Sequence, residues 1–240
     1  MESDLALVAL ETGSLEVCGQ FTFSSNYTFL AEVNYQGQII KTVYKPSKGE
    51  MPLWDFPRYS LAHREVAAFI VCRALHWDFI PPTVFRKGSK AFGKGALQLY
   101  VDHDPNYHYF TFSEDDKQRL RPIVLFDLLA NNADRKGGHL LMDKQGKLWA
   151  IDHGLCFHEQ DKLRTVIWDF CGEAIPPDLL DDISRFALQL IEDNSLVDLL
   201  GQHIARNEIK AMLSRIQRLN YERVYPCPPQ DRRAYPWPPV

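Results

Sequence analysis

The chain has 240 residues, of which 45% are hydrophobic, and its formal net charge is −4. This length allows one domain with a sizeable core, whereas the negative charge and the lack of a basic patch argue against binding to nucleic acid or to an anionic membrane surface. No stretch approaches the roughly 18 apolar residues of a membrane span, and the acidic start lacks the features of a secretory signal, so we expect a soluble, cytoplasmic protein.

The first 101 residues predict a lobe built on a small antiparallel sheet. Runs of β-prone residues alternate with turn signals, and one stretch with apolar residues at helical spacing interrupts them. Two prolines end that helix, because proline has no amide hydrogen to donate. The predicted elements are three strands within residues 15–45, with turns at 24–26 and 36–38, a helix over 61–76 capped by Ser60, and two strands over 83–86 and 95–101.

Beyond residue 101 the pattern becomes mostly helical. Pro122 lies inside the first predicted helix of this part and should kink it or divide it in two. We expect an α+β, two-lobed fold, with the sheet lobe over residues 1–101, the helical lobe over 102–225 and an extended, proline-rich tail over 226–240. The predicted elements of the second lobe are helices over 113–131, 177–191 and 207–221 and a β pair over 139–142 and 148–151.

The five cysteines are scattered and odd in number, and no two of them have the C-x-x-C spacing. This distribution indicates neither a disulfide framework nor a structural zinc site. We therefore expect free, buried thiols at Cys18, Cys72, Cys156, Cys171 and Cys227.

Two aspartates in the second lobe are the candidates for chemistry. Asp134 follows a predicted helix, and Asp152 follows the predicted β pair, where Gly154 would permit a sharp turn. Phosphoryl transfer needs one carboxylate that orients or deprotonates the attacking hydroxyl and another that holds a metal against the phosphates. In the sheet lobe, Lys45 has apolar neighbours, and Glu65 on the predicted helix could pair with it. This set of residues favours a phosphoryl-transfer site.

The order and spacing of these motifs resemble the ATP site of phosphatidylinositol 3-/4-kinase-like proteins, which belong to the protein-kinase-like superfamily. Over residues 24–172, well over half of the sequence, the chain more closely resembles a bacterial family placed beside those kinases. The motifs that carry the resemblance are Val43–Lys45, Pro52–Pro57, His63–Glu65, Leu97–Val101, Asn132–Arg135, Ala150–Leu155 and Lys162–Thr165.

The resemblance implies a catalytic role for four residues. Asp134 would be the catalytic base and Asp152 the main metal ligand. Lys45 would contact the phosphates of ATP, and Glu65 would anchor Lys45. Each residue taken singly has an ordinary alternative as a solvated lysine, a helix-surface glutamate or a turn aspartate, but their joint occurrence favours the site.

The resemblance also implies two nucleotide-binding segments. A polar hairpin loop would cover the phosphates with its backbone amides and hydroxyls, although its residues are equally typical of an ordinary β-turn. A connector between the lobes would meet the adenine edge, and a plain buried strand end explains it equally well. The loop is Ser24, Ser25 and Asn26, and the connector is Leu99, Tyr100 and Val101.

One position departs from the kinase pattern. Five residues after Asp134 the pattern has an asparagine as second metal ligand, and this chain has His139. Imidazole suits Mg²⁺ less well than an amide or carboxylate oxygen and tolerates Mn²⁺ better. We therefore expect Asp152 and His139 to hold Mg²⁺ or Mn²⁺, and we expect His153 to have a structural role.

Three rival functions remain open from the sequence. The expected activity is transfer of the γ-phosphate of ATP to a hydroxyl of an unidentified protein or small-molecule acceptor. A catalytically silent ATP-binding module or a nucleotidyl transferase would use nearly the same residues. A metal-dependent phosphohydrolase is a weaker alternative, because its histidine and aspartate candidates have no compact ligand spacing. Those candidates are Asp102–Asp104, His108, Asp152, His153 and His158.

Two loops have a functional and a structural interpretation. The cations of residues 162–168 could approach an anionic substrate, but we favour a loop whose apolar residues dock on the helical lobe. Trp54 and Phe56 could cover the nucleotide cleft or could fasten their loop to the sheet.

Overall fold

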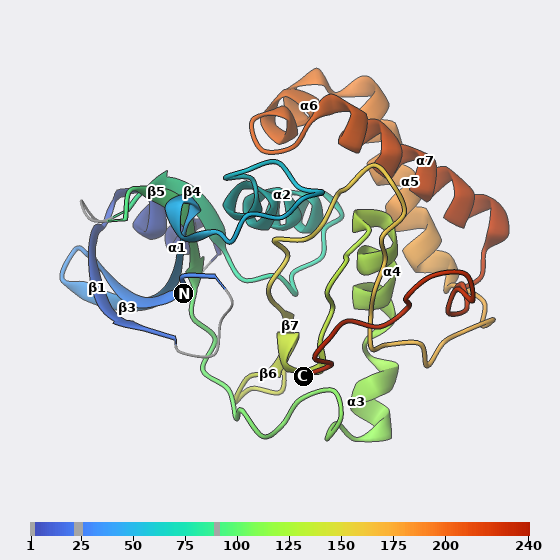
Figure 1. The fold of residues 1–240 in the computed structure, drawn as a ribbon, viewed down its shortest axis with the longest axis horizontal. Helices are drawn as coiled ribbons and strands as arrows, with labels where there is room; N and C mark the ends of the chain where they lie inside the picture. The colour runs from blue at the N-terminus through green and yellow to red at the C-terminus, as the bar shows by residue number, and fades with distance from the viewer. Residues whose placement is uncertain (1–2, 22–25, 89–91) are drawn as a thin grey trace.

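The computed structural model describes residues 3–21, 26–88 and 92–240. Figure 1 shows the sheet at one end of the molecule and most helices at the other, as expected of an α+β, two-lobed fold. Among the described residues, no helix is long and apolar enough to span a membrane.

The sheet lobe contains five antiparallel strands, as predicted. Its spatial order is β1-β2-β3-β5-β4, so β3 lies at the centre of the sheet. The turn expected at 24–26 falls partly outside the described residues. The strands are β1 (Ser14–Gln20), β2 (Phe29–Tyr35), β3 (Gln38–Pro46), β4 (Thr83–Lys87) and β5 (Lys94–Leu99).

Two helices, α1 (Ser3–Thr12) and α2 (Leu61–Ala74), cover opposite faces of this sheet. On β5, Leu97 packs in the cluster that contains residues of α1, while Ala96 packs against α2. Adjacent strand residues point to opposite faces. The sequence prediction included α2 but not α1.

The helical lobe contains a short β pair at its edge (Figure 1). Pro122 lies in the first turn of α4, where its missing amide hydrogen is tolerated, and α3 ends just before it. The predicted helix over 113–131 is therefore two helices. The prediction did not include α6. The elements are α3 (Glu114–Gln118), α4 (Arg121–Ala130), β6 (Leu140–Met142), β7 (Leu148–Ala150), α5 (Pro177–Glu192), α6 (Asn194–Gly201) and α7 (Arg206–Glu222), and the short 3-10 helices η1 (Ser47–Gly49) and η2 (Gly137–His139) complete the described set.

The principal core connects the two lobes through α2. Ala67 and Val71 of α2 belong to the same buried cluster as Leu125 and Leu129 of α4, and Leu75, directly after α2, belongs to it as well. Because α2 also packs on the sheet, this helix fixes the position of the sheet lobe relative to the helical lobe.

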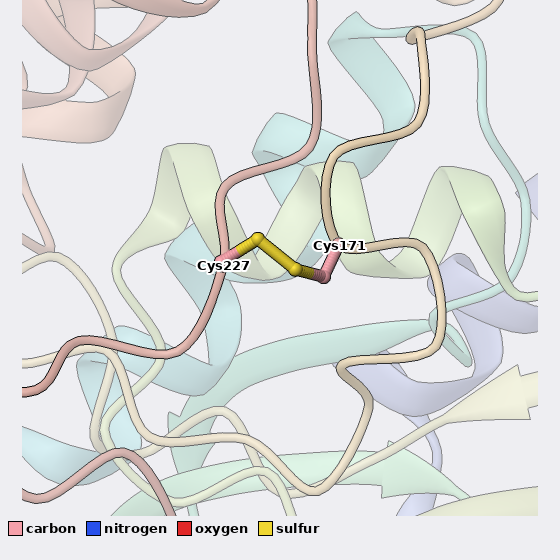
Figure 2. The surroundings of a disulfide bond; sticks show 2 residues. All are labelled: Cys171 and Cys227. Carbon is pink, nitrogen blue, oxygen red and sulfur yellow. A yellow bond between two sulfur atoms is a disulfide. The ribbon is translucent and has the colours of Figure 1, made fainter.

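A disulfide joins Cys171 to Cys227 (Figure 2) and corrects the expectation of five free thiols. The two Cα atoms are 4.6 Å apart, and 56 positions separate the residues in sequence. Such a separation leaves no local spacing signature, so the sequence could not indicate the pair. The remaining cysteines are free, with Cys72 and Cys156 buried and Cys18 exposed.

Candidate active site

A cleft of about 460 Å³ lies between the sheet lobe and the helical lobe. Its walls come from β3, α2, the end of β5 and the loops that contain the two aspartates. Ser24 and Ser25 lie outside the described residues. The structure brings the other sequence-predicted residues to this cleft, namely Asn26, Lys45, Glu65, Leu99, Tyr100, Val101, Asp134, His139 and Asp152.

Lys45 projects from β3 toward α2. Its neighbour Tyr44 packs in the core on the α1 side, so strand alternation directs Lys45 to the opposite face. The Lys45 ammonium donates to Glu65 Oε1 and, at 3.0 Å, to Asp152 Oδ1. Burial alone would lower the pKa of Lys45, but the carboxylates of Asp152 and Glu65 outweigh burial and raise it. Lys45 is therefore a fixed cation at neutral pH.

Glu65 joins α2 to the loop after β7. Its side chain is 3% exposed, and while Oε1 accepts from Lys45, Oε2 accepts from the backbone N–H of His153 at 3.0 Å. Both carboxylate oxygens are thus occupied by donors from different lobes. Glu65 orients Lys45 and at the same time holds the backbone next to Asp152.

Asp152 makes the sharp turn after β7 with its own backbone. Its φ is 60°, in the left-handed region that non-glycine residues rarely adopt. This corrects the expectation that Gly154 makes the turn. Gly154 packs on α2, where an added Cβ would lie 3.4 Å from Leu61 Cβ, an ordinary van der Waals distance, so neither the turn nor this packing requires a glycine there.

The charge of Asp152 is held by two neighbours. Oδ1 accepts from Lys45, and Oδ2 lies 3.2 Å from His139 Nε2. Burial favours the neutral acid, but Lys45 and His139 outweigh it and hold the pKa of Asp152 well below its ordinary value. The side chain is 47% exposed, so its carboxylate remains accessible to ligands in the cleft.

His139 is a neutral imidazole at physiological pH. Its side chain is 15% exposed, and burial, together with the nearby cations Arg135, Lys45 and Lys136, lowers its pKa to about 4 despite Asp152. Its Nδ1 accepts from the backbone N–H of Lys136 at 3.4 Å, which assigns the proton to Nε2, facing Asp152. Ligation of a metal through Nε2 requires the other tautomer.

The donor set fits a divalent ion that shares its coordination with a nucleotide. In the described part of the chain, no three histidine, cysteine or acidic side chains are grouped so that they could hold a metal by themselves. Mg²⁺ is usually held by one or two carboxylates together with substrate phosphates and water. Asp152 and His139 form such a partial set of protein ligands. A metal-dependent phosphohydrolase would need a complete cluster of protein ligands.

Asp134 lies beside a cation in the same cleft. Its backbone N–H donates to Asn132 Oδ1 at 3.0 Å, and its Oδ2 lies 3.6 Å from Lys136 Nζ. Burial, with a smaller contribution from Asp152, raises its pKa from 3.8 to about 6, although Lys136 and Arg164 act in the opposite sense. A carboxylate with this pKa is ionised at neutral pH and is a better proton acceptor than an ordinary aspartate.

A buried network holds the two aspartates in a fixed relation. Arg135, fully buried, donates to both carboxylate oxygens of Asp127 at 2.7 and 3.0 Å and to Ile151 O at 2.7 Å. Arg135 also lies 2.8 Å from His153 Nε2. The Arg135 guanidinium therefore contacts the residues on both sides of Asp152. Arg135 itself directly follows Asp134 in the sequence.

His153 has the structural position that the sequence analysis favours. It is completely buried, and burial together with Arg135 lowers its pKa well below the ordinary value. Its ring does not line the cleft and packs edge to face against Phe126, with centroids 5.6 Å apart. His153 thus helps to fix the backbone of Asp152 and has no access to a ligand.

The connector and the segments that flank the cleft are held by backbone hydrogen bonds. Tyr100 N–H donates to Lys41 O at 3.0 Å, and Leu99 N–H donates to Pro82 O at 2.9 Å. Asn26 Oδ1 accepts from Met51 N–H at 2.7 Å, so it links two loops at the mouth of the cleft.

The loop over residues 162–168 docks on the helical lobe. Leu163, Val166 and Ile167 are buried in the principal core. Lys162 Nζ pairs with Asp55 Oδ2 at 2.9 Å, and both side chains are nearly buried, so this lysine is unavailable to a substrate.

The two aromatic residues of the Met51–Pro57 loop also lie outside the cleft lining. Phe56 is buried beneath the Arg64 guanidinium, whereas Trp54 is 92% exposed. Phe56 therefore fastens the loop to Arg64 of α2 and to His158, and not to the sheet as the sequence analysis suggested, and neither aromatic residue covers the cleft.

Sequence reasoning missed three residues of the site, Lys136, Asp127 and Arg135. Lys136 lines the cleft and lies next to Asp134. A cation in a loop beside two glycines was an available signal for Lys136. Arg135 belongs to a motif of the family resemblance, but its pairing with Asp127 had no sequence signal, because that pairing depends on the path of the chain between α4 and β6.

Comparisons with known proteins agree with this geometry. The sequence profile of the family described as phosphatidylinositol 3- and 4-kinase matches residues 57–206. Protein Rv2133c of Mycobacterium tuberculosis is 37% identical in an alignment that covers 95% of this chain and 93% of that protein. Phosphatidylinositol 4-kinase gamma 4 of Oryza sativa subsp. japonica is 30% identical over 48% of this chain, and the match covers 24% of the rice protein. The chain thus matches about a quarter of that plant kinase.

Solved kinases share the fold. The Golgi casein kinase with Mn/ADP bound has a TM-score of 0.59 at 16% identity, over 99% of this chain and 80% of its own. The Helicobacter pylori proinflammatory kinase CtkA has a TM-score of 0.53 at 11% identity, over 90% of this chain and 94% of its own. At these identities the likeness establishes a two-lobed, protein-kinase-like fold.

Proposed function

Because the chain belongs to the phosphatidylinositol 3- and 4-kinase family, we propose that it is an ATP-dependent phosphotransferase that moves the γ-phosphoryl group to a hydroxyl of an acceptor. The observation that carries the proposal is the arrangement of four groups in one cleft. Lys45 and His139 both contact Asp152, and Asp134 lies on the same wall. This arrangement supports the role of each residue in the reaction.

The reaction uses Asp134 as the proton acceptor. The acceptor oxygen attacks the γ-phosphorus, its proton passes to the Asp134 carboxylate, and the bond between the γ-phosphorus and the bridging oxygen breaks. ADP leaves with the electron pair of that bond. The raised pKa of Asp134 suits a base that must take a proton near neutral pH.

Lys45 supplies a positive charge to the phosphates of ATP. Glu65 fixes its position, and since Glu65 is almost fully buried, it cannot compete for the nucleotide or the acceptor. A divalent cation held by Asp152 and His139 would offset the negative charge on the β- and γ-phosphate oxygens. The Golgi casein kinase with Mn/ADP bound supports a nucleotide together with a divalent metal as ligands of this fold.

The acceptor is a hydroxyl of a protein or a small molecule. The names of the plant relatives refer to phosphatidylinositol, but the match covers 24% of the rice protein, and the solved neighbours include a casein kinase. Neither phosphatidylinositol nor casein is therefore assigned as the substrate of this chain. A screen of acceptors should therefore contain proteins, soluble alcohols and phosphatidylinositol vesicles.

The proposal is tested with ATP labelled at either the γ- or the α-phosphate, supplied with Mg²⁺ or Mn²⁺ and a lysate as the source of acceptors. We expect label on an acceptor from γ-labelled ATP and none from α-labelled ATP. Label from the α-position would establish nucleotidyl transfer instead. Binding of ATP without any transfer would indicate that the protein is a catalytically silent nucleotide-binding module.

A matched pair of lysine variants locates the activity in the cleft. Lys45→Met should lower transfer by about a hundredfold or more, because a charge aimed at the reacting phosphates is lost. Lys144→Met is the control, since Lys144 is exposed on the β6–β7 turn and pairs with Asp102. Equal activity of the two variants would contradict the proposed site.

A further inference from the structure

The C-terminal tail, residues 226–240, returns from α7 to the catalytic loop, the segment over residues 131–139 that carries Asp134. Figure 1 shows the tail ending beside β6 and β7, far from the α7 end of the helical lobe. The tail forms no helix or strand of its own. Its position therefore depends on the groups that it contacts.

Two of these contacts reach the segments that flank Asp134. Ala234 O accepts from Thr165 N–H at 3.0 Å, and Pro239 O accepts from Gly137 N–H at 2.8 Å. Gly137 lies three positions after Asp134, and Thr165 pairs in a parallel β-bridge with Arg135, the residue directly after Asp134. The tail thus connects the catalytic loop with the loop that packs against it.

The catalytic loop needs external support at this point. Gly137 and Gly138 follow one another, and two consecutive glycines give a backbone much conformational freedom. The Phe110 ring packs so closely on Gly137 that a Cβ there would lie 2.6 Å from it. The tail adds a second contact at Gly137, because Pro239 O accepts from its N–H.

The Cys171–Cys227 disulfide anchors the start of the tail (Figure 2). On the α7 side of the bond, Tyr225 is buried, and its backbone exchanges hydrogen bonds with Gly172 and Glu173. After Cys227, the next side-chain tie is the ion pair between Arg232 and Asp161, whose side chains are 32% and 48% exposed. Such an exposed pair contributes little by itself, so the disulfide is the covalent restraint at the start of this stretch, and two backbone hydrogen bonds hold its later part.

We infer that residues 226–240 are a positioning segment of the catalytic loop, which the Cys171–Cys227 disulfide holds in place for the transfer reaction. This inference rests on the proposed function for its effect on turnover. Both cysteines are exposed, so a dithiol reductant reaches the bond. Two electrons and two protons from the dithiol convert the disulfide into two thiols, and the dithiol closes into its own disulfide. The tail then loses its anchor, and the catalytic loop loses its support.

Steady-state kinetics of the oxidised and dithiol-treated protein test this inference. We expect reduction to lower kcat about tenfold, because small misplacements of a catalytic group have large effects on rate. The KM for ATP should stay within about twofold, since the tail contacts none of Lys45, Glu65 and Asp152. Re-oxidation should restore kcat. An unchanged kcat would overturn the inference, and a raised kcat would identify the tail as an obstruction instead.

Cysteine variants exclude effects on other thiols. Cys171→Ser with Cys227→Ser should have the low kcat in both redox states. Cys18→Ser is the matched control, because Cys18 is exposed and free, and it should respond to the dithiol like the unaltered protein. A dithiol response that persists in the double variant would overturn the inference.

Amide hydrogen exchange tests the contact without any activity. On reduction, the amides of Gly137 and Thr165 should exchange faster, while the amide of Leu99, which bonds Pro82, should not change. Unchanged exchange at both tail-bonded amides would overturn the inference. If exchange responds but no protein form transfers phosphate, the proposed function is wrong and the support of the loop by the tail stands.

Discussion

At the scale of single residues, Asp134 sets the acid limit of the proposed reaction. Burial raises its pKa from 3.8 to about 6, so its basic form is lost as the pH falls through about 6. We expect kcat/KM to fall about tenfold per pH unit below that value and to level off above it. A pH profile at saturating Mn²⁺ measures this. A limb centred near pH 4 would contradict the role of the buried carboxylate.

The same pKa predicts that Asp134 lowers the stability of the free protein at neutral pH. The folded state binds the Asp134 proton more tightly than the unfolded state does. Protonation of Asp134 therefore favours the folded state below about pH 4, and this contribution to the free energy of unfolding is lost as the pH rises through 6. Asp134→Asn should therefore raise the free energy of unfolding at pH 8 by up to about 3 kcal/mol and have little effect at pH 4. Urea titrations at the two pH values measure the free energy of unfolding. The control variant is Asp115→Asn, because Asp115 is exposed.

We expect His139 to set the metal preference of the proposed site. Its Nε2 proton faces Asp152, so ligation of a metal there requires a change of tautomer. Asparagine supplies an amide oxygen, which Mg²⁺ prefers. We expect His139→Asn to raise the ratio of Mg²⁺-supported to Mn²⁺-supported transfer by about tenfold, measured under matched ATP concentrations. An unchanged ratio would mean that His139 donates to Asp152 and does not ligate the ion.

The sequence could indicate residues whose chemistry is local, but not those that depend on the path of the chain. Lys45, Glu65 and Asp152 have recognisable neighbours, and the structure brings them together. The contacts of Arg135 had no comparable signal, because its bond to Ile151 O exists only when the β pair folds back on the loop. The left-handed backbone of Asp152 was likewise assigned to a glycine, since strain of this kind follows from tertiary constraint.

At the scale of elements, α2 is fastened to α7 by a buried ion pair. Arg64 Nη2 lies 2.7 Å from Glu208 Oε1, with side chains 2% and 9% exposed, and Arg64 also donates to Cys156 O at 2.6 Å. Removal of one partner leaves a buried charge without compensation. We expect Glu208→Gln to lower the free energy of unfolding by about 3 kcal/mol in urea titrations.

The control for that prediction is an exposed pair in the same part of the molecule. Asp198 lies 3.4 Å from Arg206, and both side chains are mostly exposed. Asp198→Asn should change the free energy of unfolding by less than about 0.5 kcal/mol. Equal losses in the two variants would show that the burial of Arg64 and Glu208 is not what stabilises the pair.

Elements with a strong local pattern were predictable, and those formed by tertiary packing were not. The sheet strands, α2, α5 and α7 follow their sequence patterns closely. The short helix α1 is stabilised by burial of Ala9 and Leu10 against the sheet, which no local pattern reports. The disulfide was missed for the same reason, because α5, α6 and α7 separate its two cysteines in the chain.

At the scale of the whole molecule, several contacts join the two lobes across and beside the cleft. Lys45 contacts Asp152 across it, and Glu65 binds the backbone of His153. The ion pair of Asp55 with Lys162 adds a further tie at the edge of the helical lobe. Since α2 also belongs to the principal core, the two lobes share their stabilising contacts.

These shared contacts predict that the nucleotide-free protein unfolds in one cooperative transition. Differential scanning calorimetry should give a ratio of calorimetric to van't Hoff enthalpy near one. Two separate transitions would show that the lobes are stabilised independently.

Nucleotide should move that whole transition, because ATP and its metal would contact both lobes. Ligand at about 100 times its Kd adds about 2.7 kcal/mol, which for a chain of this size raises Tm by about 5–10 °C. Asp152→Asn should abolish most of the shift, since a neutral amide attracts the cation less strongly than a carboxylate does. Asp134→Asn should keep the shift and lose turnover, because a base acts on the acceptor hydroxyl and not on the triphosphate. If both variants lost the shift equally, the separation of metal binding from proton transfer would be wrong even though the fold is that of a kinase.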